Sequence, residues 1–143
     1  MVTGMNRVTL LLTLAGMLTM LAPPANAQID EDLAVGQVEY QFSCASCHGL
    51  DGKGEGPVSL FLTAKPSDLT QMSAGNNGQF PSQVIFETID GRVDGGVHGS
   101  RTMPVWGARY LKEFQNFGGE QNNAALVEAR ITRLVNFLET IQE

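Results

Sequence analysis

Residues 44–48 read Cys44-Ala45-Ser46-Cys47-His48, the pattern C-x-x-C-H. This spacing is the attachment signature of a c-type haem. Each thiol adds to one haem vinyl group, and the two intervening residues set the reach between the vinyls. The next residue carries the imidazole beneath the iron, where an axial histidine is one of the protein's main influences on haem chemistry. The motif therefore predicts one covalently bound haem c, attached through Cys44 and Cys47 with His48 as an iron ligand.

Three other interpretations of the motif compete with this one. A thioredoxin-like dithiol also shows C-x-x-C, but it requires a βαβ setting of which the chain gives no sign. A zinc site could recruit Cys44, Cys47, His48 and His98, although neighbouring Cys47 and His48 close on a single tetrahedral ion poorly. A simple disulfide in an exported protein is the third alternative. Haem attachment explains the motif best because it gives every residue a role.

The N-terminus has the three parts of a secretory signal peptide. Arg7 gives a positive start, residues 8–22 are apolar, and Ala25–Ala27 is a small-x-small cleavage site. The apolar run is short for a bilayer span, and a proline pair follows it. We therefore expect a signal peptide over residues 1–27, a single cytochrome-type domain over 28–143, and a periplasmic location with no membrane span after cleavage. Covalent haem attachment and an oxidising compartment both lie outside the cytoplasm.

The charge of the chain restricts its partners. Nine Lys and Arg stand against 15 Asp and Glu, a formal net charge of −6. Without the signal peptide, which holds only Arg7 among these, the formal charge is −7, and two haem propionates would add to it. Such a charge argues against nucleic acid or an anionic membrane surface as a partner. It favours redox protein partners with basic docking patches, attracted in a salt-dependent way.

Hydrophobic spacing predicts a helix at each end of the mature chain. Leu33, Gly36, Tyr40 and Cys44 recur at i, i+3, i+7 and i+11, on one helix face. A glycine inside a helix costs about 0.5–1 kcal/mol relative to alanine. Gly36 therefore indicates the close approach of another helix, or else a tolerated helix glycine. From about Asn123 to the C-terminus, apolar and polar residues again occupy opposite helix faces.

Shorter helices are expected between these two. Ser67 or Asp68 is a candidate cap for a short helix that ends before the turn residues 75–78. A further helix opens at Pro81-Ser82 and stops at Gly91. Because we find no convincing strand, internal repeat or second domain, the predicted fold class is all-α.

The stretch from Gly49 to Pro57 reads GLDGKGEGP. A phosphate-binding loop is not favoured, because no strand precedes it and no lysine-serine pair follows it. We expect a tight loop over the haem edge, with the Pro57 carbonyl accepting the other ring N–H of His48 and so fixing the tautomer. The alternative is an ordinary turn proline.

Two methionines remain in the mature chain, Met72 and Met103. A thioether paired with histidine raises the reduction potential of a haem. Met103 lies in an extended segment, and Pro104 biases it away from helix, so Met103 is expected to be the second metal ligand. Met72, in or beside a short helix, is expected to fill the core. His98, in a glycine-rich loop, is the rival ligand.

Other side chains could contact the haem. Trp106 is expected to pack on it, and its indole N–H would need a partner if buried. Arg101 and Arg109 could pair with the propionates, although a solvated arginine is the plainer interpretation of each.

These residues together resemble the class I c-type cytochromes over nearly the whole mature chain. The resemblance implies a fold in which the N- and C-terminal helices cross and short helices and loops surround one covalently bound haem. In that family the N-terminal helix crosses at a glycine, here Gly36, and Leu134 and Phe137 look like its crossing partner. Gly56-Pro57 is similar to the segment that supports the histidine. The MPVWG segment beginning at Met103 is similar to the methionine-ligand segment of small bacterial monohaem cytochromes.

The resemblance implies a periplasmic monohaem carrier of single electrons, with His48 and Met103 as iron ligands. We expect no independent catalysis, since no nucleophile-base pair or paired acid site is recognisable. One alternative is an electron-transfer subunit of a periplasmic oxidoreductase complex, so a monomer or a subunit is expected. Another is a ligand-binding or peroxidase-like haem protein with an open iron position.

Overall fold

The computed structural model describes residues 25–91, 103–115 and 120–143 of the chain, and within these ranges it contains helices and loops but no strand. The α-helices are α1 (Ala25–Ser43), α2 (Ala45–His48), α3 (Ser82–Asp90), α4 (Trp106–Phe114) and α5 (Glu120–Thr140). Three single-turn 3₁₀ helices, η1 (Ser59–Phe61), η2 (Leu69–Gln71) and η3 (Ala74–Asn76), lie in the connection between α2 and α3. The all-α prediction is confirmed.

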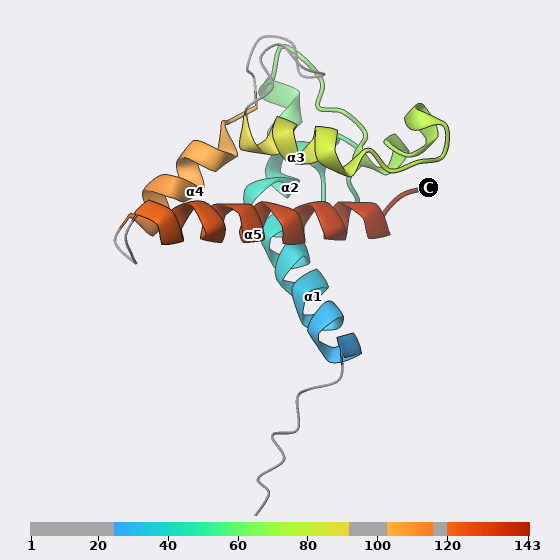
Figure 1. Cartoon of the computed structure of the whole chain (residues 1–143). Helices are drawn as coiled ribbons and strands as arrows, with labels where there is room; N and C mark the ends of the chain where they lie inside the picture. Colours follow the sequence, from blue (N-terminus) through green and yellow to red (C-terminus); the bar gives the residue numbers. More distant parts are fainter. Residues whose placement is uncertain (1–24, 92–102, 116–119) are drawn as a thin grey trace, which may run out of the picture.

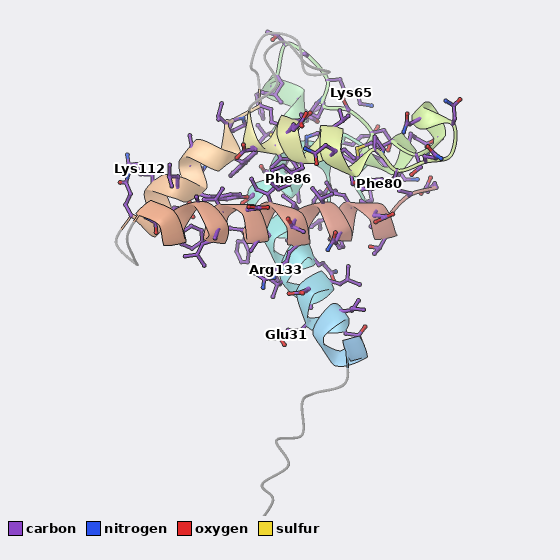
Figure 2. The ribbon with its side chains drawn as sticks, in the orientation of Figure 1. Glu31, Lys65, Phe80, Phe86, Lys112 and Arg133 are labelled. Carbon is purple, nitrogen blue, oxygen red and sulfur yellow. The ribbon has the colours of Figure 1, made fainter. Side chains whose placement is uncertain are left out.

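Helix α1 crosses α5 (Figure 1). At Gly36 the backbone of α1 lies directly against α5. A Cβ placed on Gly36 would collide with the main-chain carbonyl of Arg133 and lie 3.0 Å from the Cβ of Phe137. Arg133 is seen where the two helices pass each other (Figure 2). One turn along α1, the ring of Tyr40 lies 5.4 Å from the ring of Phe137. The prediction that Gly36 marks a close helix approach is confirmed.

The core lies between α5 and the helices packed on it. Five residues of α5 at helical spacing are almost fully buried: Val127, Ile131, Leu134, Val135 and Leu138. Tyr40, Ile85, Ile89, Trp106 and Tyr110 meet them from the other three long helices. Phe80 and Phe86, labelled in Figure 2, pack against this core with part of their surface exposed. Full burial of one large apolar side chain stabilises the fold by roughly 1.5–3 kcal/mol, so this cluster holds the crossing together.

The predicted helix boundaries are largely as observed. The Asp68 carboxylate caps η2 by accepting from the backbone N–H of Thr70 at 2.9 Å. Helix α3 ends at Gly91, whose φ of 90° places it in the left-handed region that favours glycine. Helix α5 begins at Glu120, three residues before the expected start at Asn123. The start of a helix differs by a few residues from the one expected from spacing because the first turn makes few intrahelical hydrogen bonds.

Helix α4 was not predicted from the sequence. It follows Pro104 and begins with a Trp-Gly pair, neither of which is a strong helix former. Its apolar face consists of Trp106, Tyr110 and Phe114, spaced i, i+4 and i+8. That spacing was the signal that could have revealed the helix.

Among the helices of the described residues, none is long and apolar enough to cross a bilayer. Residues 1–24 of the predicted signal peptide lie outside the described residues. Its last three residues, Ala25–Ala27, are the first residues of α1. His98 and Arg101 also lie outside the described residues.

Candidate functional site

The C-x-x-C-H motif forms a single helical turn at the end of α1. Helix α1 ends at Ser43, and the backbone N–H groups of Cys47 and His48 both donate to the carbonyl of Cys44, at 3.0 and 2.9 Å. Cys44 is buried and Cys47 is half-buried. His48 is also buried, with 6% of its surface exposed. One turn of α2 therefore presents both thiols and the imidazole together.

The imidazole of His48 has a defined tautomer. Its Nδ1 lies 3.0 Å from the main-chain carbonyl oxygen of Ser67. A carbonyl can only accept, so in the neutral ring Nδ1 carries the proton and the lone pair lies on Nε2. This is the arrangement in which a histidine binds a metal ion through Nε2 while its other nitrogen is held by the protein.

The expected partner of this ring N–H was the Pro57 carbonyl, and the structure corrects that prediction. Pro57 is exposed, and it lies in a turn whose backbone is hydrogen-bonded to the backbone of α2. The N–H of Gly56 donates to Cys47 O at 3.0 Å, and the N–H of Val58 donates to Ser46 O at 2.9 Å. These two bonds hold Pro57 against the backbone of α2, while the later segment at Ser67 supplies the carbonyl to the ring. A backbone carbonyl is present at every residue, so no residue pattern could have indicated Ser67 as the acceptor.

A cleft adjoins the motif. It comprises two cavities of about 310 and 370 Å³ that share four lining residues, Cys44, His48, Ser67 and Met103. Each volume lies in the range of small-molecule and cofactor sites, roughly 300–1,000 Å³. The first cavity is lined also by Phe42, Cys47, Lys65, Pro104, Trp106 and Arg109. The second is largely apolar, with Leu69, Met72, Ile85, Ile89 and Leu138 among its walls.

The structure brings Met103 and His48 to the same cleft. Met103 lies just before α4, is half-buried and lines both cavities. Met72 packs against the core, as expected, and also faces the second cavity. Trp106 is buried and lines the first cavity. Both methionines could therefore reach a group held in the cleft, but only Met103 borders the part that contains Cys47.

Arg109 also lines the first cavity. Its guanidinium carbon lies 5.0 Å from the centroid of the Trp106 ring, within the range of a cation–π contact. Its Nε lies 3.6 Å from a carboxylate oxygen of Glu113, one turn further along α4. Arg109 therefore offers a positive charge at the mouth of the cleft, close to the indole.

Burial raises the pKa of the Cys44 thiol to about 12, and the nearby Glu39 and Cys47 add to the shift. A reactive dithiol instead needs a lowered pKa, because the thiolate is the nucleophile. Cys44 in this environment is therefore a weak nucleophile. A thioether carries no charge and is compatible with this burial. In the described parts of the chain, no three His, Cys, Asp or Glu side chains are placed to hold a metal ion together.

The fold and the site define an all-helical protein in which two thiols, an imidazole and a thioether line one cleft. No protein-family model, curated protein or solved structure matches the chain. Its function therefore has to be inferred from these residues and their geometry.

Proposed function

We propose that this protein is a periplasmic c-type cytochrome that carries single electrons through one haem, attached covalently at Cys44 and Cys47. The observation that carries the proposal is the cleft itself. The two thiols and the imidazole of the motif lie on its wall, and Met103, distant in sequence, lines the same two cavities.

The residues of the cleft fit a haem in three ways. The donors are an imidazole whose lone pair is on Nε2 and a soft thioether, a ligand pair that haem iron accepts. The surface of the second cavity is mainly apolar and would exclude water from the porphyrin. The first cavity has Lys65 and Arg109 among its described lining residues and no carboxylate, which suits two anionic propionates.

A bound haem would supply reversible one-electron chemistry, and the protein would supply position and environment. Cys44 and Cys47 would fix the porphyrin to α2. The Ser67 carbonyl keeps the proton on Nδ1 of His48 and holds the ring in one orientation. Met103 would be the second iron ligand, and a thioether paired with an imidazole would raise the reduction potential.

Exposed apolar side chains close to the motif support transfer to a protein partner. Phe42, which borders the first cavity, is 84% exposed. Leu60 and Phe61 are 86% and 85% exposed, and they belong to η1, which packs against α2. Single exposed apolar residues are ordinary, but several close to one redox motif suit a docking face. The partner could be a free redox protein or the catalytic subunit of an oxidoreductase complex, and stable co-purification would indicate the second.

Optical spectra of the holoprotein test this proposal. The ferric wild type should show a methionine-to-iron charge-transfer band, which Met103→Ala abolishes. Met72→Ala is the matched control and should retain the band. Ferrous Met103→Ala should bind carbon monoxide rapidly, while the wild type should not. Rapid carbon monoxide binding by the wild type would contradict the carrier and favour a haem protein with an open iron position.

A further inference from the structure

A cluster of polar side chains outside the cleft joins three helices. Glu39 of α1 accepts from Arg130 of α5 at 2.7 Å and from the hydroxyl of Tyr110 of α4 at 2.6 Å. The Glu39 side chain is only 11% exposed and that of Arg130 27%. Ser43, one turn later on α1, donates a further hydrogen bond to the same carboxylate. This Glu39 cluster (Glu39, Ser43, Tyr110 and Arg130) is therefore largely withdrawn from solvent.

The Arg130 side chain contacts three side chains of α4. Its guanidinium carbon lies 3.9 Å from the centroid of the Tyr110 ring and 5.8 Å from that of Phe114. Its terminal nitrogen donates to Glu113 at 2.8 Å. The planar guanidinium thus contacts two rings and a carboxylate of α4 while its Nε holds Glu39 of α1. Arginine suits this role because its fork and its flat face bind at the same time.

The cluster connects the two parts of the chain that furnish the proposed iron ligands. On α1, Glu39 stands one turn before Ser43, after which the haem motif begins at Cys44. On α4, the rings of Tyr110 and Trp106 are 5.6 Å apart, and Trp106 lines the cleft. Met103 lies just ahead of that helix. Fixing Tyr110 therefore fixes the helix from which the Met103 segment extends.

We propose that the Glu39 cluster positions Met103 over the cleft, by holding α4 in place against α1 and α5. The inference rests on the proposed function and deepens it. None of the four residues lines the second cavity, and Glu39, Tyr110 and Arg130 line neither, so they act through α4 and are positioning residues. A neutral thioether would depend on such support, since a ligand has to be held close to its binding geometry by the residues around it.

The chain offers a matched control for this cluster. Asp32 and Arg133 form another ion pair between α1 and α5, at 2.6 Å, and among the described residues this pair does not include a side chain of α4. Asp32→Asn therefore removes an α1–α5 pair without releasing α4. Glu39→Gln removes an ion pair between α1 and α5, and it also weakens the hydrogen bond from Tyr110 that links α4 to α1. Tyr110→Phe removes only the hydroxyl that reaches Glu39 and keeps the ring beneath Arg130.

The experiment compares these three variants with the wild type as haem-loaded proteins. Two quantities are measured: the temperature at which the ferric methionine–iron band is lost, relative to global unfolding, and the rate of carbon monoxide binding to the ferrous protein. In Glu39→Gln and Tyr110→Phe the band should disappear well before unfolding, and carbon monoxide should bind about tenfold faster than in the wild type. Asp32→Asn should keep the wild-type rate and lose its band only on unfolding.

The opposite result would be that Glu39→Gln and Tyr110→Phe bind carbon monoxide at the rate of Asp32→Asn and lose the band only on unfolding. This result would overturn the inference and leave the proposed function standing. If Glu39→Gln does not fold, Tyr110→Phe decides, since it lacks a single hydroxyl. A wild type without the methionine–iron band would overturn the ligand assignment and this inference together.

Discussion

The backbone of Gly36 lies against the main-chain carbonyl of Arg133, so that nothing larger than hydrogen fits between α1 and α5 at this point. Gly36→Ala should therefore destabilise the protein even though alanine is the better helix former. Overpacking of this kind costs roughly 1–3 kcal/mol, because backbone rather than a flexible side chain has to move. Denaturant unfolding measures the loss.

Gln37→Ala is the control for this substitution. Gln37 is the next residue of α1, and its side chain is exposed. The free energy of unfolding of Gln37→Ala should stay within about 0.5 kcal/mol of the wild type. Equal losses in the two variants would show that the helix crossing is not as tight as the structure indicates.

The C-terminal end of the chain should stabilise the segment that holds His48. The amide nitrogen of Gln142 donates to the carbonyls of Leu69 and Leu138, at 2.8 and 2.7 Å. Its amide oxygen accepts from the N–H of Ser73 at 2.9 Å. Gln142→Ala leaves these backbone groups without that partner, so we expect a loss of about 1–3 kcal/mol. Amide hydrogen exchange should accelerate at Ser73.

Gln83→Ala provides the comparison for Gln142→Ala. Gln83 is an exposed glutamine of α3 whose amide donates to Glu87, one turn away, and to no other described residue. Its removal should change stability by less than about 0.5 kcal/mol and leave exchange at Ser73 unaffected. If amide hydrogen exchange at Ser73 is unchanged in Gln142→Ala, Gln142 does not stabilise this segment.

Stability should depend on pH through Glu39. Burial acts to raise the pKa of its carboxyl, but hydrogen bonds from Arg130, Ser43 and Tyr110 outweigh burial and hold the pKa below its ordinary value of 4.5. A carboxyl whose pKa is lower in the folded than in the unfolded protein stabilises the fold fully at pH values above its pKa in the unfolded protein. That contribution is lost as the pH falls through the folded pKa. The stability advantage of the wild type over Glu39→Gln should therefore shrink on acidification.

Unfolding of both proteins from about pH 7 to about pH 3 measures this dependence. A constant difference between the two curves would mean that the Glu39 carboxyl has the same pKa in the folded and unfolded protein. A difference that grows on acidification would contradict the sign of the shift.

Features encoded in local spacing were predictable from the sequence. The motif from Cys44 to His48, the crossing glycine Gly36 and the stop at Gly91 each follow from residue type and position. The backbone acceptor for His48 was missed because a carbonyl leaves no trace in the sequence. Pro57 was the plausible candidate, and the turn that fastens it to α2 could not be foreseen.

The Glu39 cluster could not have been predicted either. Glu39 and Arg130 are 91 residues apart, and Glu39 and Tyr110 are 71 apart. In sequence, a glutamate or an arginine on an amphipathic helix looks like part of a solvated face. Only the packing of α1 and α4 against the same helix, α5, makes them buried partners.

Mass spectrometry can show whether one haem is joined covalently to Cys44 and Cys47. The protein should be produced in a host that exports it and matures c-type cytochromes, then digested. The peptide containing Cys44–His48 should carry the mass of one haem, and the adduct should be absent when both cysteines are replaced by alanine. A wild-type peptide with unmodified cysteines and no added tetrapyrrole would contradict the proposed attachment.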